Sequence, residues 1–411
     1  MSVGSTWSAS HEFIASHVVE PRTVDEVQTL VRTEPRVRAL GTRHSFTDIA
    51  DTPGVLVNLG RWNEEPRLDH GTGRVRVPGG IRYGELAVWL HERGRALANM
   101  ASLPHISVAG AVATGTHGSG VGNGSLAAAV AVLELVNGRG DVVRLHRGDA
   151  DFDGAVVSLG SLGIVTHLEL DTEPAFDLTQ TVHEGLTWDA LLDRLDEVLG
   201  AAYSVSVFTR WAGDEVGQVW TKSRDGEAVV PGTHPAREQR HMIPGMDATL
   251  TTPQLGEAGP SHERLPHFKL GFLPSSGDEL QSEYLLPREN GVEALRAMRS
   301  LAEEIEPVLH VSEIRTIAAD SLWLSGAYDV DTIGLHFTWL REPARVAALL
   351  PRLEELLLPL KARPHWGKVF AAEAAKLAPL YPRWDDFAAL VRRHDPDGRF
   401  ANDWTERVLG R

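Results

Sequence analysis

Two glycine-rich segments in the first third of the chain constrain its fold more than any other feature. The first, GTRHSF at residues 41–46, follows an apolar run at residues 37–40 that predicts a short strand; the second is SVAGAVATGTHGSGVGNGS at residues 107–125. A glycine-led turn after a strand exposes backbone N–H groups that can cradle a pyrophosphate, and His44 places an imidazole beside them. A motif as short as the first recurs by chance, so its weight comes from the second segment.

The second segment does not fit the dinucleotide fingerprint of the Rossmann type. That fingerprint needs glycines at positions one, three and six, whereas Gly118 and Gly120 are followed by Asn123 at position six. No acidic residue with an evident ribose-binding role follows at the expected distance. A second interpretation stays open: small residues also let two backbones pack closely. Close packing of two backbones and close approach of a backbone to a ligand both require that side chains be small or absent.

Length and charge exclude several classes of protein. A chain of 411 residues with 42% hydrophobic residues can bury a large core over two or three domains. Its formal charge of -16 argues against nucleic acid and anionic membranes, and the absence of cysteine excludes disulfides and sulfur metal ligands. We expect no metal, no signal peptide and no membrane span, since the longest apolar run, residues 126–133, is far below the roughly 20 residues required. We therefore expect a cytoplasmic protein.

The pattern of apolar residues changes near residue 172. Before it, short strands and helices alternate: helices are expected at 24–31 and at 83–93, ending at Gly94, and strands at 55–59, 74–77, 130–136 and 142–145. The last two strands flank Asn-Gly, which predicts a hairpin.

Beyond residue 172, a loop-rich stretch at 225–260 suggests extended loops over a larger antiparallel sheet. Amphipathic helices at 293–304 and 345–358 would cover that sheet, and Pro351 should kink or restart the second of them. Helical periodicity returns from residue 371, and the tail ends in the turn DPDGRFAND followed by a short capped segment.

Motifs along nearly the whole chain resemble one family. They are GTRHSF, VRVPGGIRYGEL, NMASLPHISVAGAVATGTHGSGVGNGSL, SLGSLGIVT, AAYSVSVFT, HERLPHF, SSGDELQSEYLLPRE, EIRT, HFTW and PHWGK. In these the chain resembles flavoproteins of the vanillyl-alcohol oxidase type, and within them the alditol oxidases that act on xylitol and sorbitol. The resemblance implies an α+β fold of two domains: an FAD-binding domain at 1–172 and a substrate (cap) domain at 173–370, with a large antiparallel sheet covered by helices. Residues 371–411 would return to the FAD-binding domain.

The resemblance also assigns the cofactor, FAD, to the two glycine loops. It implies that the first loop wraps the diphosphate through Gly41, Thr42, Arg43, His44, Ser45 and Phe46. Further along the cofactor it places Ser102, Ser107, Gly110, Thr114, Gly115, Thr116, His117 and Val165. His44 would be bonded covalently to the 8α-methyl carbon of the flavin, which is reasonable because a neutral imidazole is a competent nucleophile. Arg43 adds a cation beside this histidine and would disfavour its protonation.

Three clusters in the second half can supply alcohol chemistry. Loss of a hydroxyl proton while hydride passes to flavin N5 needs a base and groups that stabilise a developing alkoxide. On expected strands, alternation puts each pair on one face: Glu313 with Arg315, and His336 with Thr338. In PHWGK, Lys368 follows a glycine, with Trp366 on its own face. Taken one at a time, these residues also fit a surface ion pair, a core histidine and a solvated lysine.

The family's substrate site gives these residues roles. His336 and Lys368 would hold the terminal hydroxyl and assist loss of its proton, while Glu313 and Arg315 bind the neighbouring hydroxyl. Ser102 would contact the distal end of a polyol, and Thr338 would also bind substrate.

Ala101, a small residue ahead of Ser102, would leave room for oxygen at the flavin. We expect an oxidase that converts a polyol and O2 to an aldose and hydrogen peroxide, and that works as a monomer. Two alternatives are a sugar-lactone oxidase or dehydrogenase of the same fold, and an inactive flavin-binding protein; nothing in EIRT, HFTW or WGK is visibly degraded.

Overall fold

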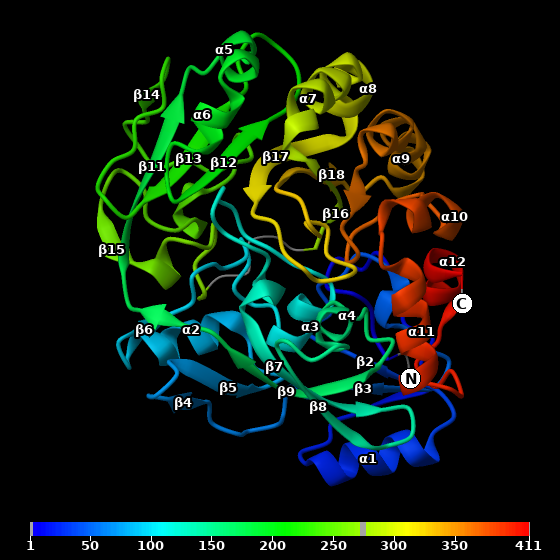
Figure 1. Cartoon of the computed structure of the whole chain (residues 1–411). Coiled ribbons are helices and arrows are strands. Elements are labelled where there is room, and N and C mark those ends of the chain that lie inside the picture. The colour runs from blue at the N-terminus through cyan, green and yellow to red at the C-terminus, as the bar shows by residue number, and fades with distance from the viewer. Residues whose placement is uncertain (1–2, 272–276, 411) are drawn as a thin grey trace.

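The amino-terminal part of the protein contains two small sheets, seen in a computed structural model that describes residues 3–271 and 277–410 (Figure 1). A parallel three-stranded sheet has the order β1-β3-β2, with β1 at His17–Val19, β2 at Val37–Ala39 and β3 at Val55–Val57. An antiparallel five-stranded sheet has the order β4-β5-β9-β7-β8, with its strands at Arg67–Asp69, Arg74–Pro78, Gly163–Leu170, Val130–Asn137 and Val142–His146. The expected hairpin is therefore present as β7 and β8.

Four helices pack with these sheets. They are α1 (Val24–Thr33), α2 (Tyr83–His91), α3 (Val108–Ala113) and α4 (Phe152–Val156). In α1, the side chain of Thr23 accepts a hydrogen bond from the Glu26 N–H, and Val27 and Val31 are fully buried. Two elements are shorter than we predicted. Helix α2 ends at His91, two residues before the predicted end, and β3 ends at Val57, two residues before its predicted end at residue 59.

The second part is built on one nine-stranded sheet. Its order is β14-β11-β13-β12-β17-β18-β16-β19, and β15 pairs with β11 beside this path. A two-stranded ladder of β10 (Glu173–Pro174) with β6 (Arg95–Ala96) lies at the junction with the first part. The strands of the large sheet are β11 (Asp177–Glu184), β12 (Ser204–Thr209), β13 (Gln218–Ser223), β14 (His234–Pro235), β15 (Ala258–Pro260), β16 (Glu279–Pro287), β17 (Leu309–Ile317), β18 (Thr332–Leu340) and β19 (Arg363–Pro364).

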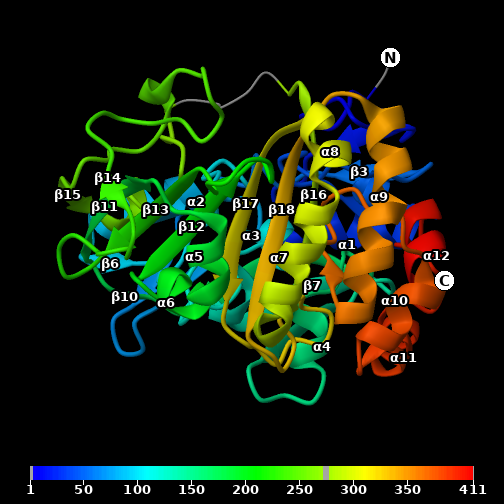
Figure 2. The same ribbon diagram turned by 90° about the horizontal axis from the view of Figure 1, so that it is seen from above.

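Helices cover one face of this sheet (Figure 2). They are α5 (Trp188–Asp193), α6 (Leu195–Leu199), α7 (Gly291–Ser300), α8 (Ala302–Ile305) and α9 (Pro343–Leu357). Alternate residues of β18, among them Leu335, Phe337 and Trp339, are fully buried in the core between the sheet and the helices. Of the kink or restart expected at Pro351, the restart does not occur, because helix α9 continues through this residue; a kink there stays a prediction. We attribute the continuation of the helix to its apolar stripe, because packing of several leucines outweighs the one hydrogen bond that a proline removes.

The carboxy-terminal helices pack onto the core of the first part. They are α10 (Ala374–Leu377), α11 (Trp384–His394) and α12 (Asp403–Leu409), and α12 is capped by Asn402 as the sequence suggested. Their apolar side chains join the cluster that contains α2, α3 and the five-stranded sheet. The exact domain boundaries stay a prediction.

Backbone hydrogen bonds tie the glycine loops to the second part of the protein. The Phe46 N–H donates to the Gly367 carbonyl oxygen (2.8 Å), and the Gly120 N–H donates to the Thr316 carbonyl oxygen (3.0 Å). The first loop is thereby fixed against the segment that follows β19, and the second against β17. Among the described residues, the helices all fall short of the length and apolar character that a bilayer crossing demands.

Candidate active site

One cavity of about 1010 Å³ lies between the two parts of the protein and is lined by both. Of the residues assigned to the cofactor, all but one are on its wall: Gly41, Thr42, Arg43, His44, Ser45, Phe46, Ser102, Ser107, Gly110, Thr114, Thr116, His117 and Val165. Gly115 is the exception, and its φ of +66° gives a conformational reason for a glycine there. Ala101, Glu313, Arg315, His336, Thr338 and Lys368 line the same cavity.

The two glycine loops meet where neither has a side chain. A Cβ added to Gly41 would lie 2.7 Å from Ser107 Oγ, and one added to Gly110 would lie 2.8 Å from the same atom. A side chain at either position would therefore force the Ser107 hydroxyl to move. The glycines lie on the cavity wall and also let the two loops pack closely.

His44 presents a neutral ring with one unengaged nitrogen. Its Nδ1 lies 2.9 Å from Thr42 Oγ1, and its ring stacks on Trp7 at 5.5 Å. Within the described residues, its buried Nε2 has no hydrogen-bond partner. Burial lowers the pKa of His44 to about 4, helped by His105 and Arg82. An uncharged imidazole with a free lone pair is the form that can act as a nucleophile.

Arg43 does not have the influence on His44 that its position in the sequence suggested. Its guanidinium turns away and donates to the carbonyl oxygens of Val3 (3.0 Å) and Ser5 (3.3 Å). Arg82 is the arginine that acts on the pKa of His44. Adjacency in sequence failed here because the Arg43 side chain reaches back to the amino-terminal residues.

Three adjacent strands place polar side chains side by side on the face of the sheet toward the cavity. In the antiparallel registers, His336 on β18 is opposite Glu283 on β16 and opposite Glu313 on β17. Thr338 is likewise opposite Gln281. Because side chains alternate along a strand, the same register sends the apolar neighbours of these residues into the core on the other face.

Glu283 is the centre of the charge network. Its side chain is 0% exposed; Oε1 accepts from Arg315 Nη2 and Oε2 accepts from Lys368 Nζ, each at 2.6 Å. Burial alone raises the pKa of Glu283, but Arg315, Lys368 and His117 outweigh burial and hold it well below the usual value. Burial lowers the pKa of Lys368 from 10.5, against the opposing effect of Glu283.

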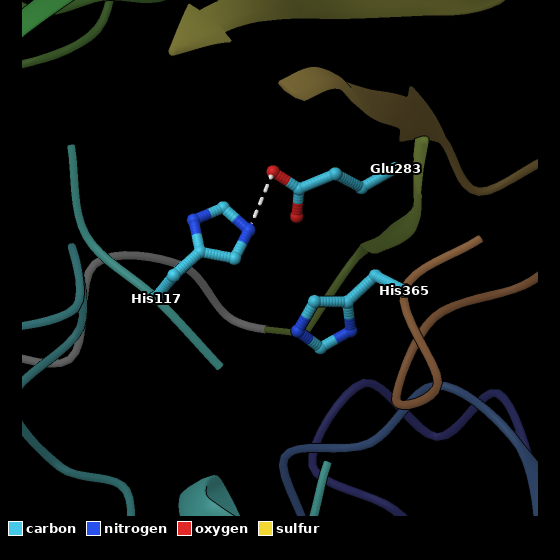
Figure 3. A group of neighbouring side chains, drawn as sticks. All are labelled: His117, Glu283 and His365. Carbon is cyan, nitrogen blue, oxygen red and sulfur yellow. Dashed lines mark ion pairs between the residues drawn. The ribbon is translucent and has the colours of Figure 1, made fainter. Parts of the chain in front are cut away.

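His117, Glu283 and His365 form a cluster with the geometry of a potential metal site (Figure 3). Their ligand atoms lie within 4.8 Å of one another, and His117 Nε2 is 3.3 Å from Glu283 Oε1. Both oxygens of Glu283, however, already bind cationic side chains, and His365 Nδ1 accepts from the Gly367 N–H at 3.1 Å. A metal ion would have to displace these cations, so we assign the cluster to the charge network; the absence of a metal stays a prediction.

The surroundings of His336 define its tautomer. The amide nitrogen of Gln281 donates to Glu279 at 2.6 Å, so Oε1 of Gln281 faces His336 Nε2 at 3.1 Å. That oxygen can only accept, and His336 Nε2 must therefore carry the hydrogen. Burial and Lys368 lower the pKa of His336 well below 6.5, which keeps the ring neutral. Nδ1, 4.0 Å from Glu313 Oε2, is thus left as a proton acceptor.

Glu313 and Arg315 complete the wall. Oε1 of Glu313 pairs with His267 Nε2 at 2.9 Å, and Arg315 Nη1 donates to Ser102 Oγ at 3.3 Å. Burial alone raises the pKa of Glu313, but Arg315 and His267 lower it far below 4.5, so Glu313 is ionised.

Comparisons with known proteins agree with this architecture. A family profile described as an FAD binding domain matches residues 15–146, and one described as D-arabinono-1,4-lactone oxidase matches residues 278–408. An alditol oxidase from a Streptomyces species is 46% identical, covering 98% of this chain and 98% of the relative. The chain belongs to the alditol oxidase subfamily of the vanillyl-alcohol oxidase type flavoproteins.

More distant relatives of this flavoprotein share its full length. An L-gulono-1,4-lactone dehydrogenase from Mycobacterium tuberculosis is 32% identical over 99% of each chain. Among solved structures, a solvent-stable cholesterol oxidase matches with a TM-score of 0.78 and 14% identity, covering 99% of this chain and 97% of that one. At that identity the match shows the fold, with its FAD-binding part and large antiparallel sheet.

The cavity fits FAD on its own chemistry. The side-chain-free contact between Gly41 and Gly110 exposes backbone on the cavity wall, and backbone N–H groups are what a diphosphate binds. His44 adds a buried nitrogen that has no hydrogen-bond partner among the described residues.

Several polar residues of the site escaped the sequence analysis. Glu283, Gln281, His267 and His365 stood in recognised motifs but were given no role, although the alternation of Gln281 and Glu283 in ELQSEY was a usable signal. Trp366 was misplaced: it stacks on Tyr381 at 5.0 Å in the core and does not share the cavity with Lys368. PHWGK leaves the strand at Pro364, so the alternation rule does not apply to it.

Proposed function

We propose that the protein is an FAD-dependent alditol oxidase. It oxidises the terminal primary hydroxyl of a polyol such as xylitol or sorbitol to the aldose and reduces O2 to hydrogen peroxide. One observation carries the proposal: a neutral imidazole, a carboxylate and two cations face the same cavity as the glycine loops. The 46% identity to an alditol oxidase supports the polyol as substrate.

His336 and Lys368 act on the terminal hydroxyl. His336 Nδ1 accepts its proton, because Gln281 holds the hydrogen of the ring on Nε2. The Lys368 ammonium stabilises the negative charge that develops on the oxygen, and the ion pair with Glu283 keeps that ammonium in place.

Glu313 and Arg315 bind the neighbouring hydroxyl. Oε1 of Glu313 is already engaged by His267, which leaves Oε2 for the substrate. Arg315 is held by Glu283 and contacts Ser102. A substrate long enough to reach Ser102 would therefore bind to the site through several of its hydroxyls. A primary alcohol with no second hydroxyl leaves these buried groups unmatched and should bind weakly. Thr338 adds a hydroxyl next to His336 on the same strand.

Bound FAD supplies the two-electron oxidation. We propose that the first glycine loop holds its diphosphate, that His44 is bonded to its 8α-methyl carbon, and that the small side chain of Ala101 leaves space for oxygen. The buried Nε2 of His44, which has no partner in the part of the chain that the structure describes, and the position of Ala101 on the cavity wall support these assignments.

A lactone oxidoreductase is the second candidate. The profile described as D-arabinono-1,4-lactone oxidase spans residues 278–408 and thus the strands that carry Glu283, Glu313 and His336. A lactone carries a ring hydroxyl and a carbonyl in place of an open chain of hydroxyls. The two functions therefore differ in the substrate that turns over, not in the cofactor.

Purified protein tests both candidates directly. Its absorption spectrum should show flavin, and xylitol, sorbitol and glycerol should give hydrogen peroxide in air in step with substrate loss, while L-gulono-1,4-lactone gives none. Turnover of the lactone alone would favour the second candidate, turnover only with an artificial electron acceptor would make the protein a dehydrogenase, and a colourless protein that takes up no FAD would refute both.

A further inference from the structure

A lysine is buried behind the substrate-binding wall without reaching the main cavity. Lys222, on β13, is 1% exposed. It lines a separate small chamber together with Ser102, His267, Glu313 and Arg315, and it is not on the wall of the large cavity. Lys222 can therefore affect a substrate only through its neighbours.

Lys222 and Glu313 are joined through the ring of His267. Lys222 Nζ donates to the Leu265 carbonyl oxygen and lies 3.1 Å from His267 Nδ1. On the other side of the ring, His267 Nε2 lies 2.9 Å from Glu313 Oε1. The three side chains form a continuous chain of hydrogen bonds that ends at a carboxylate of the substrate site.

The chemistry of these groups sets the direction of the chain. Burial lowers the pKa of Lys222 to about 7, and at either protonation state the amine has N–H groups for both of its acceptors. The ionised carboxylate of Glu313 can only accept, so the hydrogen of His267 is on Nε2; on the other side of the ring an N–H of Lys222 donates to Nδ1 and holds the same tautomer. Burial and Lys222 lower the pKa of His267 to about 4, which keeps the ring neutral.

This arrangement leaves one oxygen of Glu313 for the substrate. Oε1 is held by His267, whereas Oε2 faces His336 Nδ1 at 4.0 Å, beyond hydrogen-bond distance. If His267 carried its hydrogen on Nδ1, the lone pair of Nε2 would oppose Glu313 Oε1 and the carboxylate would turn away from this position.

We propose that Lys222 is a positioning residue: it fixes the tautomer of His267, and through it the carboxylate of Glu313, and thereby sets the affinity for the hydroxyl beside the reacting carbon. The inference rests on the proposed function for the role of Glu313. A role in stability alone fits less well, because burying an amine costs more than burying a methionine of similar volume.

The tautomer can be measured without any substrate. We would label the histidines with 15N, assign His267 by its loss in His267→Asn, and record the ring nitrogens in wild type and in Lys222→Met. In the wild type, His267 should carry its hydrogen on Nε2. In Lys222→Met, a larger fraction of His267 should carry it on Nδ1. An unchanged tautomer in Lys222→Met overturns the proposal. Thr221→Val is the matched control, because Thr221 is a buried polar residue of the same strand that hydrogen-bonds to His183 and not to His267.

Kinetics then separate positioning from general damage. For xylitol, Lys222→Met should raise KM about tenfold or more with less than about threefold change in kcat, since the substrate then forms one fewer hydrogen bond to a charged group. For propane-1,3-diol, which has no hydroxyl beside the reacting carbon, kcat/KM should stay within about twofold. Lys222→Gln, which keeps an N–H donor, should recover part of the xylitol KM.

The outcomes distinguish this inference from the proposed function. Equal losses for both substrates, or a loss matched by Thr221→Val, would make Lys222 merely structural and overturn the inference. If Lys222→Met does not fold, the xylitol KM of His267→Asn decides: it should rise, and an unchanged KM overturns the inference. If wild type turns over no polyol but Lys222 still controls the tautomer of His267, the alditol oxidase assignment fails while the control of Glu313 by Lys222 stands.

Discussion

Replacing Glu283 by glutamine should damage both stability and turnover, because this one side chain neutralises two buried cations. Glu283→Gln keeps the shape but removes the charge that meets Arg315 and Lys368 at 2.6 Å each. Removing one partner of a buried ion pair costs about 3–5 kcal/mol in the free energy of unfolding. Burial already lowers the pKa of Lys368, and without Glu283 it falls further, so the ammonium form is less favoured. We expect kcat to fall by about 100-fold or more.

The stability difference should depend on pH in a defined direction. The pKa of Glu283 in the folded protein is held well below the unfolded value of 4.5, so its contribution is complete above that value and is lost as the pH falls through the folded pKa. Urea unfolding of the holoprotein should therefore show a large gap between wild type and Glu283→Gln at pH 7 that narrows below pH 4.5.

Glu354 offers a matched control for this experiment. It is also buried, at 1% exposure, but its Oε1 accepts from the Tyr284 hydroxyl and the Ala371 N–H, and burial raises its pKa. Glu354→Gln should thus leave kcat within about twofold, since a neutral group can accept the same hydrogen bonds. Wild-type kcat in Glu283→Gln, or an equal loss in Glu354→Gln, would refute the idea that the charge of Glu283 organises the site.

Four further predictions follow from the same geometry. Lys368→Met should lose at least about 100-fold in kcat yet keep its flavin spectrum, and undiminished turnover would remove this lysine from the mechanism. His44→Ala should release flavin on acid precipitation, whereas a yellow pellet would contradict the covalent bond. Ala101→Val should slow reoxidation in stopped-flow mixing with O2 more than it slows reduction by xylitol; equal rates of reoxidation would refute a role in oxygen access. Because burial lowers the pKa values of His336 and Lys368, kcat/KM should show no acid limb near pH 6.5 and should fall on the alkaline side before pH 10.5.

Local patterns predicted much of the fold and one face of the site. The pairs Glu313 with Arg315 and His336 with Thr338 reach the cavity as strand alternation requires. The apolar stripe of α9 and the Asn-Gly hairpin were also visible, because each depends on residues within about ten positions of one another. The resemblance supplied what alternation could not, namely that both glycine loops face these strands.

Tertiary pairing decided what the sequence did not reveal. Glu283 matters because β16 pairs with β18 in a register that puts it opposite His336, some fifty residues further along the chain. The sequence shows Glu283 as one acidic residue among many, and nothing local distinguishes a surface carboxylate from one that holds two buried cations. At Pro351, where we expected a kink or a restart, the helix continues for the same reason, since packing against the sheet outweighs a local rule.

Gly334 illustrates how a residue without a side chain can be part of such a network. It lies on β18 opposite Arg315, two residues before His336, and thus on the face of the sheet toward the cavity. A Cβ at this position would lie 3.4 Å from Glu283 Oε1 and 3.9 Å from His117 Cε1. A Cβ alone would make ordinary van der Waals contacts at these distances, whereas a side chain longer than that of alanine would fill the space through which Glu283 reaches Arg315 and His117. A small residue on this strand is therefore what leaves room for three side chains from distant parts of the chain to meet.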